Sequence, residues 1–287
     1  AAMMRPVGLG PMHEAYPGRV IDVGIAEAEA VASAAGMAYQ GAHPVVALYA
    51  TFLNRGFDQL LMDVALHRAG VTFVLDRAGV TGADGASHNG VWDIAMCSII
   101  PGLRLAAPRD EETLRARLRE ALDVDDAPTV IRYRKGALPE PMPAVRSVGG
   151  VDILFDEAVD GSSARVLIVG TGACAPDAIE AARRLSAGGV SVTVADPQWM
   201  IPVCPELATL ARDSDCVVSV EDGIVQGGFG WSLRDAVAEA DVPVRCLGVP
   251  QEFPEHGDRS EMIAQFGFDA DGIERAAREL VERVEKR

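Results

Sequence analysis

The chain has 287 residues, of which 49% are hydrophobic and 24% charged, and its formal net charge is −16. This composition is typical of a globular core and excludes a disordered chain, while the length suggests about two domains. The acidic balance argues against partners such as nucleic acid or an anionic membrane, because phosphate groups repel such a surface. No apolar run reaches the roughly 20 residues that a membrane span requires.

The cysteines indicate a reducing compartment. There are five of them, far apart and never in a Cys-x-x-Cys pair. This pattern predicts free thiols without a disulfide framework or a zinc site, and it favours the cytoplasm. The first residues carry no apolar stretch of the kind found in signal peptides, and the chain does not begin with methionine. We therefore expect part of a longer protein or one piece of a split protein.

Helices and strands alternate along the first half of the chain. Apolar runs predict strands at 20–23, 44–51, 71–76, 103–107 and 130–133. Periodic or alanine-rich segments predict helices at 26–41, 55–69 and 110–122. The first of these helices is apolar on every side, as in a helix that is buried or packed against a partner.

Glu27 stands in the first turn of the helix predicted at 26–41. The helix dipole stabilises a carboxylate there, which is an ordinary role for such a residue. Its neighbours are mostly alanine, isoleucine and valine, and such surroundings favour a protonated carboxyl that can donate a hydrogen bond. Glu29 lies about 200° further around the helix and is expected on another face.

A long glycine-rich segment follows the strand predicted at 71–76. Residues 77–90 hold four glycines and little apolar content, together with Asp84 and His88. Because α/β proteins place binding loops at the carboxyl ends of buried strands, we expect this loop to carry chemistry. His88 is a candidate for proton transfer, although a lone loop histidine is more often a surface residue.

Basic side chains gather at the ends of two predicted strands. They are Arg77 on one strand and Arg132, Arg134 and Lys135 on the other. In an acidic chain, cations that converge on one sheet edge favour an anionic ligand such as a phosphate or a carboxylate. Surface charge balance explains any single one of them equally well.

The second half alternates in the same way after a segment rich in proline and glycine at 137–164, where little regular structure is expected. Strands are predicted at 165–169, 190–195, 216–221 and 242–247. Helices are predicted at 176–187, 204–211, 230–240 and 272–284. Such alternation predicts parallel sheets with right-handed crossovers.

One motif in this half resembles a dinucleotide fingerprint. Gly170-x-Gly172-x-x-Ala175 follows a predicted strand, and Asp196 ends the next strand. Glycines at these places let backbone N–H groups approach a pyrophosphate. A tight strand-to-helix turn of any doubly wound domain is the more ordinary explanation, and Pro176 removes one donor from the helix start. A nicotinamide-dependent oxidoreductase stays open as an alternative.

Four motifs together resemble one enzyme family. They read Asp22-Val-Gly-Ile-Ala-Glu27, Tyr49-Ala-Thr-Phe52-Leu-Asn-Arg55, Asp76-Arg77-Ala-Gly79 and Gly82-Ala-Asp84-Gly-Ala-Ser-His88-Asn-Gly90. This set, with segments 101–108, 196–199 and 250–253, resembles the 1-deoxy-D-xylulose-5-phosphate synthases, thiamine-diphosphate enzymes of the transketolase-like group. The resemblance covers essentially the whole chain but only the carboxyl-terminal part of the family's architecture.

The resemblance implies two doubly wound α/β domains with mainly parallel sheets. A pyrimidine-binding domain is expected at 1–136 and a transketolase C-terminal domain at 165–287, joined by a linker at 137–164. The segment Gly-Asp-Gly…Asn, by which the family holds diphosphate through Mg²⁺, has no counterpart here. We therefore expect no metal ligand in this chain, and cofactor binding only together with the missing diphosphate-binding domain or subunit.

The resemblance also implies roles around the cofactor. Glu27 is similar to the catalytic glutamate that hydrogen-bonds N1′ of the aminopyrimidine of thiamine diphosphate. Phe52 is similar to the ring that stacks on that pyrimidine, with Arg55 and Tyr49 beside it. The chain departs from the family at positions 28 and 29, where Ala28 and Glu29 replace the usual Gln-His.

Further roles concern the substrates, which the resemblance implies are pyruvate and D-glyceraldehyde 3-phosphate. Tyr49, Asp84 and His88 match positions that line the substrate cavity, and His88 would assist binding or proton transfer. Arg77 matches a ligand for the acceptor's phosphate, and Lys135 falls where an arginine often does the same. The implied enzyme is a homodimeric transferase in isoprenoid and thiamine precursor synthesis. Alternatives are a split transketolase-like subunit with another aldehyde acceptor and a non-catalytic partner module.

Overall fold

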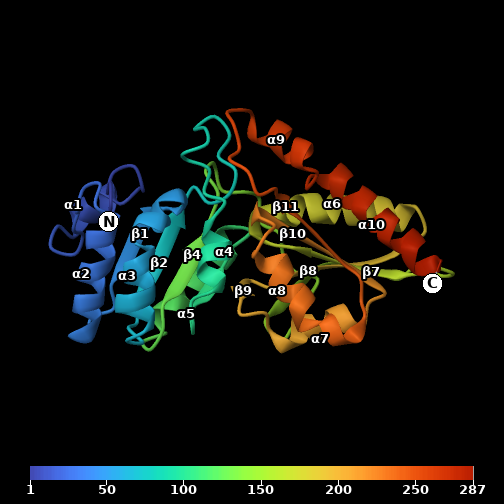
Figure 1. Ribbon diagram of the computed structural model, residues 1–287, viewed down its shortest axis with the longest axis horizontal. Coiled ribbons are helices and arrows are strands. Elements are labelled where there is room, and N and C mark those ends of the chain that lie inside the picture. Colours follow the sequence, from blue (N-terminus) through green and yellow to red (C-terminus); the bar gives the residue numbers. More distant parts are fainter. Residues whose placement is uncertain (287) are drawn as a thin grey trace.

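The computed structural model describes residues 1–286 and consists of two α/β units side by side (Figure 1). Each unit is built on one sheet whose strands are mainly parallel, which confirms the fold class predicted from the sequence. In the described part of the chain, no helix has both the length and the apolar character needed to cross a bilayer.

The first sheet has the strand order β1-β2-β4-β3-β9. Its strands are β1 (Val45–Tyr49), β2 (Thr72–Asp76), β4 (Thr129–Arg132), β3 (Arg104–Ala106) and β9 (Trp199–Ile201). The first four are parallel, whereas β9 comes from the second half of the chain and pairs antiparallel with β3. The second half of the chain therefore contributes one strand to the first sheet.

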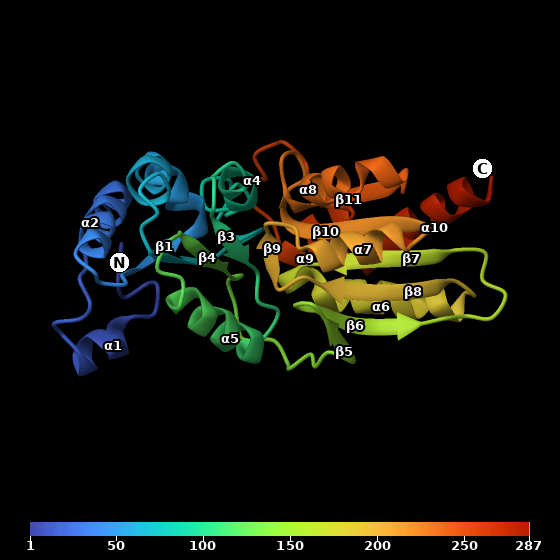
Figure 2. The same cartoon turned by 90° about the horizontal axis from the view of Figure 1, so that it is seen from below.

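Helices cover both faces of this sheet (Figure 2). They are α2 (Glu27–Tyr39), η1 (Ala50–Arg55), α3 (Phe57–Gln59), η2 (Leu60–Ala65), α4 (Asp93–Ser98) and α5 (Glu111–Leu122), whereas the short helix α1 (Gly10–Ala15) buries no residue. The α5 helix starts at a capping box in which Asp110 and Thr113 satisfy each other's backbone N–H groups. The α2 helix buries Ala30, Val31 and Ala34 at helical spacing.

The second sheet has the order β11-β10-β7-β8-β6-β5. Its strands are β5 (Arg146–Val148), β6 (Val151–Glu157), β7 (Arg165–Gly170), β8 (Ser191–Asp196), β10 (Cys216–Ile224) and β11 (Val244–Val249). Its helices are η3 (Gly172–Cys174), α6 (Ala175–Ala187), α7 (Pro205–Arg212), α8 (Phe229–Ala236), η4 (Ala238–Ala240), α9 (Arg259–Phe266) and α10 (Ala270–Glu285). Helices α6 and α10 cover one face, and α7 and α8 cover the other (Figure 1).

The carboxyl ends of the parallel strands in the two sheets face each other. Asp222 near the end of β10 contacts the loop after β2, and Gly172 after β7 packs on Ala107 after β3. Asp196 at the end of β8 pairs with Arg109. In such sheets ligands bind at the carboxyl edge, so the interface between the two units is where both domains present their loops.

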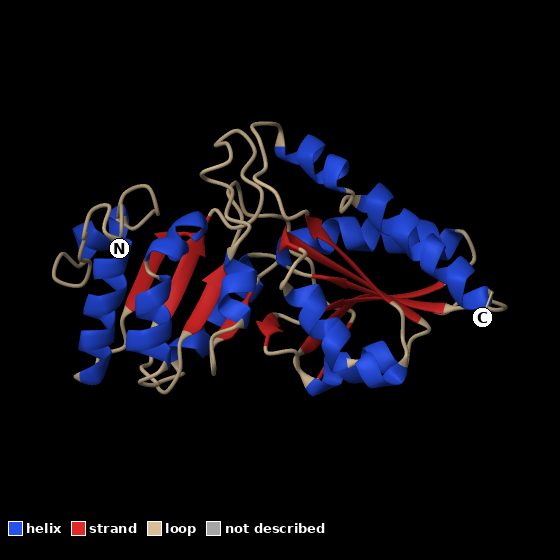
Figure 3. Ribbon diagram, in the orientation of Figure 1, coloured by secondary structure: helices blue, strands red, loops and turns tan. Residues whose placement is uncertain are grey.

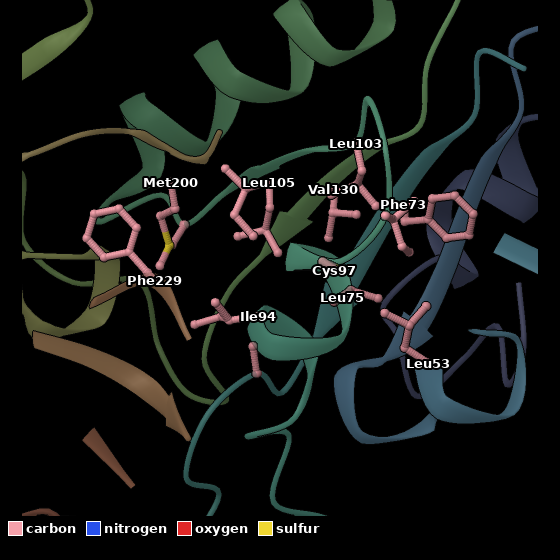
Figure 4. Close-up of a cluster of buried hydrophobic side chains, with 14 of the residues drawn as sticks. Leu53, Phe73, Leu75, Ile94, Cys97, Leu103, Leu105, Val130, Met200 and Phe229 are labelled. Atoms are coloured by element: carbon pink, nitrogen blue, oxygen red, sulfur yellow. The ribbon is translucent and has the colours of Figure 1, made fainter. Parts of the chain in front are cut away.

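One apolar core crosses this interface. In Figure 4, Phe73, Leu75 and Leu105 from the first sheet belong to the same cluster as Met200 and Phe229 from the second half. All five side chains are at most 1% exposed. A continuous core of this kind fixes how the two carboxyl edges are oriented toward each other.

Several expectations from the sequence need correction. Residues 20–23 are not a strand, because Val23 bonds the carbonyl of Ala1 and the segment runs as a loop. The helix expected at 55–69 is a short α-turn followed by a π-helix, α3 and η2. Strands β5 and β6 form an antiparallel hairpin inside the segment expected as an irregular linker. Helices α4 and α9 and strand β9 were not predicted from the sequence.

Candidate functional site

The residues that the sequence singled out converge at the carboxyl edge of the first sheet. Tyr49 ends β1, and η1 carries Phe52 and Arg55 directly after it. Arg77 follows β2 in a left-handed conformation with φ of 60°, which turns the chain sharply at the strand end. Lys135 follows β4. The parallel order of β1, β2 and β4 therefore brings residues from 49 to 135 together.

Glu27 is the most unusual group of this edge. It is 2% exposed, and its Oε1 atom is buried without a hydrogen-bond partner among the described residues. Gly56 packs against the same helical turn, because a Cβ there would lie 2.8 Å from Val31 and 3.4 Å from the backbone oxygen of Glu27. Since an unsatisfied buried carboxyl oxygen costs free energy, it points to a ligand that completes it. Glu29, as predicted, lies on an exposed face.

An aromatic and cationic ladder connects the other predicted residues. Arg55 lies 5.1 Å from the centre of the Phe52 ring, and the Phe52 and Tyr49 rings are stacked at 6.1 Å. His88 meets Phe52 edge-on at 5.5 Å, and Arg77 stacks over Tyr49 at 4.1 Å. Three of these contacts pair a π face with a cation or a ring edge, and the fourth stacks two nearly parallel rings, which are favourable geometries for aromatic side chains.

Asp84 contacts two cations at this edge, Arg77 and Lys135. Both of its carboxylate oxygens lie 2.8 Å from Nζ of Lys135, and the Arg77 guanidinium is 3.8 Å away. The hydrogen bond from Lys135 lowers the pKa of Asp84. Burial raises the pKa of Asp76 beneath them, although Arg77 opposes this shift, and burial raises the pKa of Tyr133 to about 12. The carboxylates here partly neutralise the two cations.

A cavity of about 440 Å³ opens next to these cations, between the two sheets. Arg77, Arg134 and Lys135 line it from the first unit, and Ala173 and Asp222 line it from the second. Arg134 makes no ion pair within residues 1–286, and it also lines a second cavity of about 500 Å³ beside α6 and α9. Its positive charge is therefore available to an anion that enters from solvent.

Arg132 lines the same cavity, but its charge is already paired inside the fold, contrary to the expectation that it offers this charge to a ligand. It is 5% exposed, and its guanidinium holds Asp93 with Nε and Nη2 at 2.7 and 3.2 Å. Nη2 also donates to the backbone oxygen of Asp222 at 2.8 Å. Arg132 therefore links the two units from the inside. Its pair with Asp93 is buried and stabilises the fold.

The glycine motif at 170–175 is explained by packing. A Cβ at Gly170 would lie 2.6 Å from Ala178, and one at Gly172 would lie 2.8 Å from the backbone oxygen of Ala107. Asp196, the acid that would face a ribose in the dinucleotide reading, is buried and bonded to Arg109 at 2.9 Å. These contacts account for the motif without a ligand.

Sequence reasoning missed the residues that shape the glycine-rich loop. Asn89 is fully buried, and its Oδ1 accepts from the backbone N–H of Thr81 at 2.8 Å while its Nδ2 donates to Gly85 and Pro254. Asp222 accepts from the N–H of Val80 at 2.9 Å. No sequence signal links position 222 to position 80, because only the tertiary fold brings them together.

No group of three or more His, Cys, Asp or Glu side chains suited to a metal ion is present in residues 1–286. The groups that fit an organic cofactor are instead the buried carboxyl of Glu27 and the ring of Phe52. A buried carboxyl oxygen without a partner in residues 1–286 and a half-buried aromatic ring match a flat heterocycle that carries hydrogen-bonding nitrogens.

Comparison with known proteins gives consistent results for both halves. The transketolase pyrimidine-binding domain family matches residues 1–141, and the transketolase C-terminal domain family matches residues 158–273. The chain is 54% identical to 1-deoxy-D-xylulose-5-phosphate synthase 2 of Kitasatospora griseola over 98% of its own length and 45% of the relative's.

Other relatives agree. The identity is 53% to 1-deoxy-D-xylulose-5-phosphate synthase 2 of Streptomyces avermitilis, over 100% of this chain and 45% of that protein. It is 52% to the synthase of Corynebacterium glutamicum, over 96% and 44%. A solved structure titled "Split gene transketolase, inactive beta4 tetramer" is 27% identical with a TM-score of 0.78, covering 94% of this chain and 86% of that one. The chain thus spans about half the length of the curated relatives it matches.

Proposed function

Because the chain belongs to the 1-deoxy-D-xylulose-5-phosphate synthase family of transketolase-like proteins, we propose that it supplies the pyrimidine-binding side of such an enzyme. The reaction is the condensation of pyruvate with D-glyceraldehyde 3-phosphate with loss of CO2, a step toward isoprenoid and thiamine precursors. The names of the relatives support this assignment. The observation that carries it is the buried, unpartnered Oε1 of Glu27.

The cofactor of the proposed enzyme is thiamine diphosphate with Mg²⁺, whose diphosphate would be held by a domain or subunit outside this chain. Thiamine diphosphate supplies a nucleophilic carbon and an electron sink. In this chain, Glu27 would hold the proton at the pyrimidine N1′, because its side chain is buried and its Oε1 atom has no hydrogen-bond partner among the described residues. Phe52 would stack on the same ring, and Arg55 lies over the Phe52 ring at 5.1 Å.

The substrates would meet the remaining residues of the edge. His88, whose Nδ1 is 2.8 Å from the Ser87 hydroxyl, would bind or protonate the reacting oxygen of the donor or acceptor. Tyr49 and Asp84 would line the cavity beside it. The acceptor's phosphate would take Arg77 and Lys135 as ligands, with Arg134 as a further cation at the cavity. We also propose a homodimer in the cytoplasm.

The decisive experiment combines this chain with a diphosphate-binding part from a close relative, thiamine diphosphate and Mg²⁺. We expect CO2 release from pyruvate that depends on D-glyceraldehyde 3-phosphate and on all components. A control with each polypeptide alone should be inactive. Absence of activity from an assembled complex would contradict the proposal.

The same assembly separates the two alternatives. The similarity to the split gene transketolase supports the alternative of a split transketolase-like subunit. Such a subunit would prefer another acceptor or donor in a scan of aldehydes and ketoses. A non-catalytic module would leave the activity of its partner unchanged when Glu27 is replaced. Only a catalytic role makes the activity depend on that side chain.

A further inference from the structure

The glycine-rich loop that carries Asp84 and His88 packs against the second unit. Figure 3 shows long loops gathered at the top of the view, where the two units meet, and Asn89 donates to the backbone oxygen of Pro254 at 3.3 Å. The close approach explains the loop glycines. A Cβ at Gly82 would lie 2.7 Å from the backbone oxygen of Gly257, and one at Gly85 would lie 2.5 Å from the His256 ring.

The tightest contact lies at the start of the loop. Asp222 accepts from the N–H of Val80 through Oδ1 at 2.9 Å, and Nη1 of Arg259 donates to the backbone oxygen of Val80 at 2.5 Å. Nη2 of Arg259 completes the arrangement with an ion pair to Oδ2 of Asp222 at 2.8 Å. Both backbone groups of one loop residue are therefore held by one acid–base pair from the other unit.

The Asp222–Arg259 pair is held in place by burial and by further contacts. Asp222 is 2% exposed, and its own backbone oxygen accepts from Arg132. Burial acts to lower the pKa of Arg259, but the charge and hydrogen bond of Asp222 raise it above its ordinary value, so the guanidinium stays charged. Gly79, with φ of 79°, has no room for a side chain, since a Cβ would lie 2.0 Å from the Asp222 carboxylate.

We propose that Asp222 and Arg259 are positioning residues, which clamp Val80 and thereby place His88 and Asp84 at the edge of the first sheet. This inference rests on the proposed function, because it assigns the clamp to the same site. Asp222 also lines the cavity that holds Arg77 and Lys135, whereas Arg259 does not. The effect of Arg259 on chemistry therefore passes through the loop, where a shift of about 1 Å can cost on the order of 100-fold in rate.

The first test reads the loop and needs no activity. Hydrogen–deuterium exchange of peptides covering 78–90 is measured for wild type, Arg259→Ala and Arg259→Lys. We expect at least tenfold faster exchange for Arg259→Ala and partial recovery for Arg259→Lys, which retains the charge. Arg245→Ala removes an exposed ion pair on β11 and serves as the control. Unchanged exchange in Arg259→Ala overturns the clamp, whatever the enzyme's substrate proves to be.

The second test reads the chemistry in the assembled synthase. We expect Arg259→Ala and Gly79→Ala to lower kcat about 10- to 100-fold. The same Arg259→Ala change should cost less than threefold in a His88→Ala background, because residues that act through one another are not additive. A purely structural role would give additive losses, and that result would overturn the proposal. An assembly without synthase activity would contradict the proposed function, while the exchange test would still decide the clamp.

Discussion

The carboxyl edges of the two sheets are built alike but are used differently. Each has a glycine-containing turn after a parallel strand, and each presents acids and bases to the other. At the first edge Oε1 of Glu27 has no partner and Arg134 lacks an acid, within residues 1–286. At the second edge Asp196 and Asp222 are paired with arginines. The comparison teaches that charged groups without a counter-charge, rather than glycine spacing, distinguish a site from a support.

The largest expected effect is at the incomplete carboxyl of the first edge. Glu27→Gln retains the size of the side chain but cannot share a proton with a heterocycle nitrogen. We expect the assembled enzyme to lose about 10²- to 10⁴-fold in kcat, the usual range for a general acid–base group. Stability should change little, because Oε1 has no partner to lose. Glu29→Gln, on the exposed face, is the control, and a Glu27→Gln enzyme within tenfold of wild type would refute the role.

Arg132 tests the opposite class, a cation that resembles a ligand in the sequence but is a support in the fold. Arg132→Met leaves Asp93 buried without its partner, and breaking such a pair costs about 3–5 kcal/mol in the free energy of unfolding. Urea unfolding followed by circular dichroism measures this loss. Arg115→Met removes an exposed pair with Glu111 and should cost less than about 1 kcal/mol. Equal stabilities for the two variants would contradict the assignment.

Glu221 makes the second edge sensitive to pH. Its carboxylate accepts from the N–H groups of Phe229 and Gly230 at the start of α8, yet burial raises its pKa from 4.5 to about 7. The unfolded state therefore binds fewer protons than the folded state between these values, and stability falls as the pH rises through them.

The expected size of this effect follows from the shift. Relative to Glu221→Gln, wild type should lose about 3 kcal/mol of unfolding free energy between pH 4.5 and pH 7. Subtracting the variant removes the contributions of other groups that titrate in the same range. Urea unfolding at several pH values measures the difference. A difference that is constant with pH, or that grows in favour of wild type, would show that Glu221 is charged throughout.

The smallest expected effect concerns Arg134. If its unpaired charge contacts the acceptor's phosphate, Arg134→Ala should raise the KM for D-glyceraldehyde 3-phosphate about tenfold, equivalent to roughly 1.4 kcal/mol. The kcat and the melting temperature should stay near those of wild type. Arg104→Ala, at the opposite end of β3, is the matched control. An unchanged KM for the acceptor would remove Arg134 from the site.

The sequence by itself determined the two α/β units, most of their elements and the convergence of residues 49–135 on one edge. Apolar periodicity and the order of parallel strands suffice for this, since the carboxyl ends of neighbouring strands must meet. It also placed Glu27 on a buried helical face and Glu29 on an exposed one, because helical spacing fixes both.

Only the tertiary structure decided which polar groups are satisfied. Arg132 and Arg134 are two residues apart, look alike in the sequence and line the same cavity, yet Arg132 is paired with the buried Asp93 and Arg134 has no ion pair within residues 1–286. The clamp joins Val80 to Asp222, 142 positions later in the chain, and to Arg259, 179 positions later. Strand β9 joins the first sheet from the second half of the chain. Local patterns carry no information on such pairings, because desolvation and partner geometry arise only when distant segments pack together.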